Sequence, residues 1–269
     1  MENWKDTKND LFRNAMENQW SEVFKTLEED RGLRTAKVTA TGDTVLHMAM
    51  YALDETVVVA AMVDLVLEDE ESSERSYVLE AANVKGNTPL HLAASIGNIE
   101  MCKKIGGVNP SLIATRNEAG ETPLFLAALH GQRKAFLWLH YLYMEIPGVS
   151  STNYAHCIRD NKDTILHCAI AEEHLDVAIE IIHLYKDLVK RSIFNDEGLS
   201  PLHLLAEKPS AFKSGALLGR PFGHLAYHLL GDMTKNKATT KEELEKEDHK
   251  SCVMALKDAC PVSVPVILG

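Results

Sequence analysis

Short hydrophobic runs recur along this chain, and each follows a turn-forming residue and a hydroxyl residue. The clearest copy spans residues 86–98, which read Gly-Asn-Thr-Pro-Leu-His-Leu-Ala-Ala-Ser-Ile-Gly-Asn. The copies align on their hydroxyl residues, which are Thr44, Thr88, Thr122, Thr164 and Ser200. Thr88 and Thr122 are one repeat of roughly 33 residues apart, and the longer spacings elsewhere indicate insertions between repeats. The pattern therefore predicts a repeat array, in which each unit buries its apolar face against its neighbours.

The first residues of each copy predict the start of a helix. Glycine permits the positive φ of a turn, the hydroxyl group caps the helix, and proline at the first helical position has no amide hydrogen to leave unpaired. Leucine two residues after the hydroxyl residue and a small residue five after it share one helical face, where alanine lets the next repeat approach closely. In repeat four, Lys162 replaces the turn glycine and Glu173-His174 replaces Gly97-Asn98, so we expect weaker turn geometry there.

A histidine follows three residues after the hydroxyl residue in four copies, at His47, His91, His167 and His203. Each is the same motif position one repeat further on, which indicates a structural role in bridging backbone groups rather than a ligand ladder. Phe125 replaces this histidine in repeat three. An aromatic ring fills the space but cannot make the same hydrogen bonds, which predicts a locally softer turn.

The segment Thr88 to Ala94 resembles the ankyrin-repeat consensus almost letter for letter. The resemblance implies an all-α ankyrin-repeat solenoid, with about six helix-turn-helix pairs, caps included, joined by β-hairpin-like loops. A narrower resemblance rests on Pro201 to Gly215, followed by Leu218-Gly219. This block is similar to plant ankyrin proteins of the accelerated-cell-death type, which join ankyrin blocks to a C-terminal membrane domain. It implies signalling in defence, cell death or stress responses.

The array is expected over residues 1–231, followed by a charged linker and tail over 232–269. Within it we expect an N-terminal cap at about residues 8–36, repeats beginning near residues 39, 83, 117, 159 and 195, an insertion at 207–222 and a last helix at 223–230. The acidic run 68–74 reads as an exposed loop or a binding tail, and 144–153 reads as a second insertion.

Composition narrows the functions that such an array can have. A formal net charge of −11 argues against a nucleic-acid ligand and favours a basic protein partner, although acidity also keeps a protein soluble. Five cysteines, an odd count in a chain of this size, fit a reducing compartment. Residues 1–10 contain no apolar stretch of the kind that a signal peptide needs, and no run of about 18 to 20 apolar residues occurs, so we expect no membrane insertion by the chain as given. The expected location is the cytoplasm, with the cytosolic face of the plasma membrane as an alternative.

The candidate chemistry is weak. His156-Cys157 and His167-Cys168 have residue types that hold zinc, but His167 is the motif histidine. No cysteine lies in a catalytic motif, and no glycine-rich phosphate loop follows a strand. We therefore expect no enzyme activity and no catalytic, cofactor-binding or metal-binding residue.

The remaining candidate is a surface. In an ankyrin array the hairpin tips and the exposed side of the first helices line a concave face, and the resemblance places these residues there: Asp43, Tyr51, Lys85, Asn87, Ile96, Glu118, Glu121, Leu129, His130, Asp160, Asp163, Glu172, Asp196, Glu197 and Leu199. Carboxylates dominate from repeat three onward, which predicts a non-catalytic interaction module for a basic, partly apolar segment of another protein. The alternative is the cytosolic arm of a longer membrane protein whose activity needs its membrane domain.

Overall fold

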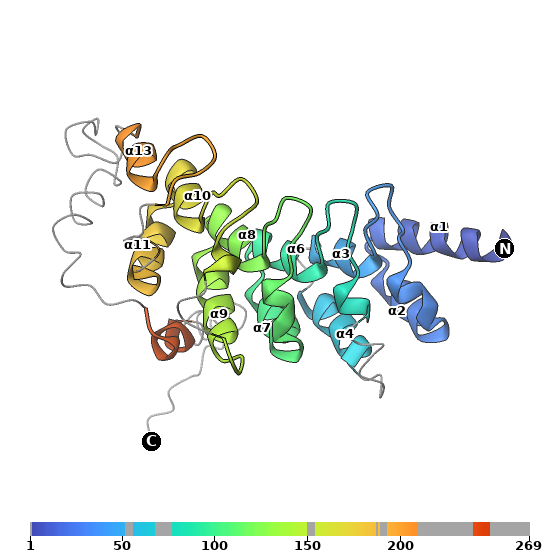
Figure 1. Cartoon of the computed structure of the whole chain (residues 1–269). Helices are drawn as coiled ribbons and strands as arrows, with labels where there is room; N and C mark the ends of the chain where they lie inside the picture. The colour runs from blue at the N-terminus through green and yellow to red at the C-terminus, as the bar shows by residue number, and fades with distance from the viewer. Residues whose placement is uncertain are drawn as a thin grey trace, which may run out of the picture.

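The computed structural model describes residues 2–51, 56–67, 77–149, 154–186, 188, 193–208 and 239–247. Successive helix pairs stack side by side from the N-terminus, and the loops between the pairs project from one side (Figure 1). The part of the chain that is described contains one isolated antiparallel bridge, Ile158 with Thr164, and no strand. The expected all-α solenoid is therefore confirmed.

The cap and repeats one to four each contribute two antiparallel helices, and repeat five contributes one helix among the described residues. The helices are α1 (Glu2–Met16), α2 (Trp20–Glu29), α3 (Val45–Met50), α4 (Thr56–Leu67), α6 (Pro89–Ile96), α7 (Ile99–Val108), α8 (Pro123–Leu129), α9 (Arg133–Met144), α10 (Ile165–Ala171), α11 (Leu175–Leu184) and α13 (Pro201–Ala206). Short 3-10 turns, η1 (Arg31–Thr35), η2 (Pro110–Ala114) and η3 (Ala155–Cys157), follow the second helices, and residues 77–80 and 241–247 are also helical.

The core is a strip along the array. The motif leucines Leu46, Leu90, Leu124 and Leu166 are buried, and so are the alanines three residues further on. First helices pack on first helices, as α6 does on α8, and second helices pack on second helices, as α7 does on α9. Because every repeat contacts only its neighbours, the stability of the array depends on one interface after another.

Turn geometry is uniform even where glycine is missing. Gly42, Gly86, Gly120 and Gly198 have positive φ angles, and Lys162 adopts the same conformation with φ of 64°. Gly97 and Gly131 end first helices at φ of 78° and 69°, and Glu173 does so at 61°. Repeat four thus keeps the turn shapes of its neighbours with side chains that favour them less.

The described residues cover only part of the C-terminal third. Residues 209–222 of the expected insertion, the expected helix at 223–230 and the acidic run 68–74 lie outside them. Within the expected linker, residues 241–247 form a helix and Leu244 is fully buried. This segment packs on the second helices of repeats three and four, so part of the expected tail is joined to the array.

Candidate protein-binding surface

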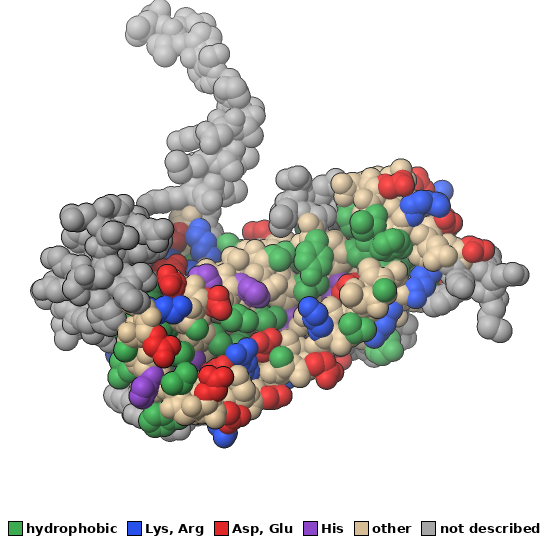
Figure 2. All heavy atoms as spheres, turned by 90° about the horizontal axis from the view of Figure 1, so that it is seen from above, with side chains coloured by type: hydrophobic (Ala, Val, Ile, Leu, Met, Phe, Trp, Pro, Cys, Tyr) green, Lys and Arg blue, Asp and Glu red, His purple; other side chains and the backbone are tan. Residues whose placement is uncertain are grey.

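The loops that precede the first helices form a row of hairpins. In each, an amide at the start hydrogen-bonds the carbonyl before the cap, as Asn83 N does with Asn87 O at 3.0 Å and Asn117 N with Glu121 O at 2.9 Å. Seen from above, acidic side chains follow one long edge of this face and apolar side chains gather along its middle (Figure 2). The face therefore has the two kinds of chemistry that the sequence predicted for a partner.

The hairpin tips carry exposed charges. Lys85, Glu118, Asp160, Asp196 and Glu197 all lie there and are exposed. Two of the acids have basic neighbours, since Asp160 lies 3.4 Å from Arg116 and Asp196 lies 2.7 Å from Lys162. Within the described residues, Glu118 and Glu197 form no ion pair, so their charges remain available to a ligand.

A second group of predicted residues lies at the C-terminal ends of the first helices. Tyr51 is 57% exposed, Ile96 and Leu129 are half-buried, and His130 and Glu172 are exposed. Among these predicted residues, the apolar ones therefore lie in repeats one to three and the acidic one in repeat four. Phe194 and Leu202 of repeat five are exposed apolar side chains as well.

The third group, the residue directly before each cap, is part of the scaffold. Asp43, Asn87, Glu121, Asp163 and Leu199 are half-buried or buried. The side chains of the first four accept hydrogen bonds from the start of the next hairpin: Asn83 to Asp43 at 2.8 Å, Asn117 to Asn87 at 2.9 Å, Arg159 to Glu121 at 3.1 Å and Asn195 to Asp163 at 2.8 Å. We call these four contacts the hairpin ladder.

Sequence reasoning missed the hairpin ladder, although a signal for it exists. Asn83, Asn117 and Asn195 each stand five residues before the aligned hydroxyl residue. The residue before the cap changes from repeat to repeat, so its role as the acceptor becomes visible only once the hairpins are side by side. Adjacent hairpins are so close that a Cβ added to Gly86 would lie 2.7 Å from the backbone nitrogen of Glu118.

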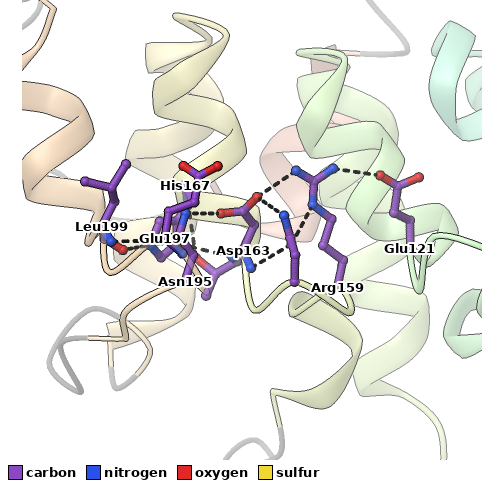
Figure 3. A network of polar contacts seen from close by, with 9 residues as sticks. Glu121, Arg159, Asp163, His167, Asn195, Glu197 and Leu199 are labelled. Carbon is purple, nitrogen blue, oxygen red and sulfur yellow. Dashed lines mark hydrogen bonds and ion pairs between the residues drawn. The ribbon is translucent and has the colours of Figure 1, made fainter.

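At the step from repeat three to repeat four, the hairpin ladder carries charge. The Arg159 guanidinium lies between the carboxylates of Glu121 and Asp163, at 3.1 and 2.6 Å (Figure 3). Burial alone would raise the pKa of Asp163, but hydrogen bonds from Arg159, Asn195 and Asn161 hold that pKa below its ordinary value. Asp163 is therefore held as a carboxylate, and the two acids share the single positive charge of Arg159 within the scaffold.

Phe125 changes the polar contacts of this same step. The Thr122 hydroxyl, with no motif histidine to bond, donates to the carbonyl of His156 at 2.8 Å. Arg116 donates to the carbonyls of Gly120, Ala155 and Ile158 at 2.8, 2.7 and 3.0 Å. Two arginines and a threonine thus hold the two repeats together where the other steps use a histidine.

The motif histidine of a regular repeat uses both ring nitrogens. His91 Nε2 donates to the carbonyl of Glu121 at 3.2 Å, so Nδ1 is the unprotonated nitrogen and accepts from the Thr88 hydroxyl at 2.8 Å. Burial lowers the pKa of His91 to about 4, which keeps the ring neutral at physiological pH. His47 and His167 are bonded in the same way and have lowered pKa values for the same cause.

These contacts bear on the zinc alternative. Both nitrogens of His167 are engaged, and burial raises the pKa of the Cys168 thiol to about 12 and that of the Cys157 thiol still further. A thiol must lose its proton to bind zinc or to act as a nucleophile. Across the described residues, no group of three or more His, Cys, Asp and Glu side chains is placed to hold a metal ion.

Residues 61–147 match the family model described as ankyrin repeats (3 copies). The match covers the repeats around α6 to α9, and the same helix pairs and hairpins extend to both sides of it. The fold is therefore an all-α ankyrin solenoid, as expected. Within the described residues, none of the helices has the length and apolar character needed to cross a bilayer.

Proposed function

We propose that this chain binds a basic, partly apolar segment of another protein along its hairpin tips and first-helix ends. Ankyrin repeats bind other proteins and form a non-catalytic interaction scaffold. The proposal of a basic, partly apolar partner rests on the distribution of apolar and acidic side chains along this face. Apolar Tyr51, Ile96 and Leu129 lie in repeats one to three. The exposed carboxylates Glu118, Glu172 and Glu197, which make no ion pair among the described residues, lie in repeats three to five.

We propose that the partner segment lies along the array in one orientation. Its apolar side chains lie over repeats one to three, where half-buried anchors supply affinity, and its Lys and Arg side chains lie over repeats three to five. Exposed carboxylates attract such a segment over a distance and lose that attraction in salt. Asp43, Glu121 and Asp163 hold the face in shape, because their carboxylates accept hydrogen bonds within the scaffold, and Arg159 offsets part of the charge of the last two.

We further propose that this binding serves plant defence, cell-death or stress signalling in the cytoplasm, at a membrane where a longer protein carries the array. The support is the resemblance of residues 201–215 to the accelerated-cell-death type. Of that block, residues 201–208 lie in the described part of the chain and begin a regular repeat.

The test is selection from a displayed library of random peptides on the full chain. We expect enrichment of peptides with clustered Lys or Arg next to an apolar segment, and an affinity that falls as salt rises. A variant with Glu118→Lys, Glu172→Lys and Glu197→Lys should bind the selected peptides at least about tenfold more weakly, since several rim charges are reversed.

The matched control is Glu17→Lys, Glu28→Lys and Glu29→Lys, which makes the same change in net charge on exposed positions of the N-terminal cap. It should keep the affinity. Equal losses in both variants would mean that net charge alone drives binding, and no loss in the first variant would place the partner elsewhere.

A further inference from the structure

The outer face of α9 is unusually apolar for the solvent side of a repeat. Residues 135–140 are all buried, including Trp138, whereas the second helix of a solenoid normally keeps one polar face toward water. Trp138 and Tyr141 lie one turn apart on this face, and Glu145 follows one turn later. An apolar surface of this kind is stable when another segment shields it from water, and residues 239–247 pack against it.

The cover contacts both second helices. The Tyr141 hydroxyl donates to the carbonyl of Thr239, Lys241 reaches Glu145 at 2.5 Å, and the Lys241 ammonium lies 6.0 Å from the Trp138 ring centre. Leu244 is 0% exposed. The helix at 241–247 lies beside the lower ends of α9 and α11 (Figure 1). We call this surface, made by Arg133, Trp138, Tyr141 and Glu145 of α9 and Glu180 of α11, the α9–α11 face.

The Glu180 carboxylate is a buried polar group on the α9–α11 face, and it needs hydrogen-bond donors. The Glu180 side chain is 7% exposed, and Arg133 donates to its Oε1 at 2.6 Å. Thr239 supplies its hydroxyl to Oε1 at 2.6 Å and its backbone amide to Oε2 at 3.1 Å. A buried carboxylate that loses such donors is costly, so this point selects a segment that offers an amide and a hydroxyl together.

The bound segment shows the pattern that the face recognises. Thr240 begins the helix with a capping box, in which the Thr240 amide donates to the Glu243 carboxylate at 2.9 Å and the Glu243 amide to the Thr240 hydroxyl at 3.3 Å. The pattern is the hydroxyl residue Thr239, the N-cap Thr240, the basic residue Lys241 and, five positions after Thr239, Leu244. All of these features are local to a short peptide.

We propose that the α9–α11 face is a second recognition site, which binds a hydroxyl-led, N-capped helix of another protein and which residues 239–247 occupy in cis. The contacts of the cis segment are few: one buried leucine, one buried polar point and ion pairs with exposed members. Exposed ion pairs add little affinity, because water screens their charges. Because residues 239–247 belong to the same chain as the face, their local concentration there is high, and a partner segment displaces them by making more contacts.

The experiment measures binding of a labelled peptide of residues 237–249 to the full chain by fluorescence anisotropy. Leu244→Asp in the chain removes the cis occupant, and Thr239→Val is a second variant that removes only the hydroxyl donor. We expect both variants to bind the peptide at least tenfold more tightly than the natural chain, in which the face is filled. A peptide that itself carries Leu244→Asp should not bind.

The double variant Leu244→Asp with Glu180→Gln locates the site and should bind the peptide at least tenfold more weakly than Leu244→Asp alone. Circular dichroism melting of each variant confirms that the array is folded. Equal binding by the natural chain and both variants, or binding that survives Glu180→Gln, would overturn the proposal. Because none of these residues belongs to the hairpin face, failure here leaves the peptide selection on that face unaffected.

Discussion

The step from repeat two to repeat three and the step from repeat three to repeat four share one backbone design and differ in their side chains. In the first, neutral groups make the contacts: His91 bonds the carbonyl of Glu121 at 3.2 Å, and Asn117 bonds Asn87 at 2.9 Å. In the second, Phe125 replaces the histidine, and Arg159 lies between two carboxylates.

The backbone differs as well. Glu118 N bonds Lys85 O at 3.0 Å, and Asp196 N bonds Asn161 O at 3.0 Å, so neighbouring hairpins are joined directly. Among the described residues, the matching bond from Asp160 to Ala119 is not formed, and Arg116 spans the same step instead. The step therefore keeps its interface without the motif histidine, and Arg116, Arg159 and Thr122 make its polar contacts.

Among the substitutions that test this comparison, Arg159→Ala should have the largest effect on stability. It leaves the carboxylates of Glu121 and Asp163 close together and without their cation, so we expect a loss of about 3 kcal/mol in the free energy of unfolding. Urea denaturation followed by circular dichroism measures it. Arg13→Ala, which breaks an exposed ion pair with Asp10, is the control and should change the free energy by less than about 1 kcal/mol. Similar small losses would show that the charged step does not depend on Arg159.

The converse change is His91→Phe, which gives repeat two the residue of repeat three without its arginines. The Thr88 hydroxyl and the Glu121 carbonyl lose a buried partner, so we expect a loss of about 2 kcal/mol. The same urea experiment applies. If the loss stays below about 0.5 kcal/mol, the ring's volume matters and its hydrogen bonds do not.

The two steps should differ in how their stability depends on pH. Burial lowers the pKa of His91 to about 4, from an ordinary value of 6.5, so the unfolded chain binds a proton in this range and the folded chain does not. Stability is therefore full above pH 6.5 and falls as the pH drops from 6.5 toward 4, by up to about 1.4 kcal/mol per pH unit for one histidine.

The substitution His91→Phe should remove the contribution of His91 to the dependence of the unfolding free energy on pH. His140, whose pKa burial also lowers to about 4, contributes a similar share across α9 and α11 and remains in the variant. Urea midpoints from pH 7 to pH 4.5 measure both chains. Parallel curves for the natural chain and the variant would show that His91 takes a proton in the folded state.

The smallest expected effect is that of Arg116→Ala. Its guanidinium is partly exposed, so we expect a loss of about 1 kcal/mol, and the change should be local. Phe125 predicts a locally softer turn in repeat three, and we expect faster amide exchange over residues 117–121 and 159–163 once Arg116 is absent. Hydrogen exchange read by mass spectrometry tests this, and unchanged protection in both segments would show that Arg116 does not brace them.

The sequence was enough for the fold because each repeat carries its own signal. A hydroxyl cap, a buried leucine and a small residue on one face define a helix start and a packing surface without knowledge of the rest of the chain. The expectation of weaker turn geometry in repeat four was wrong, because Lys162 and Glu173 adopt the same positive φ as the glycines of the neighbouring repeats.

The candidate surface was only partly visible. Exposed positions such as Glu118 and Glu197 follow from the hairpin register alone. The scaffold role of Glu121 and Asp163 depends on Arg159, which lies 38 residues from the first. The contact of Thr239 with Glu180 joins residues 59 apart, and Thr239 lies outside the repeat motif, so no local pattern announces it.

The Arg159 contacts also bear on how the molecule responds to force. When a solenoid is pulled from its ends, the tension passes through every interface in series, and the weakest one yields first. Each repeat of about 33 residues then releases roughly 110 Å of chain. We expect the ion pairs of Arg159 to resist this separation where the direct backbone bond between hairpins is not formed, so that repeats three and four stay paired under load.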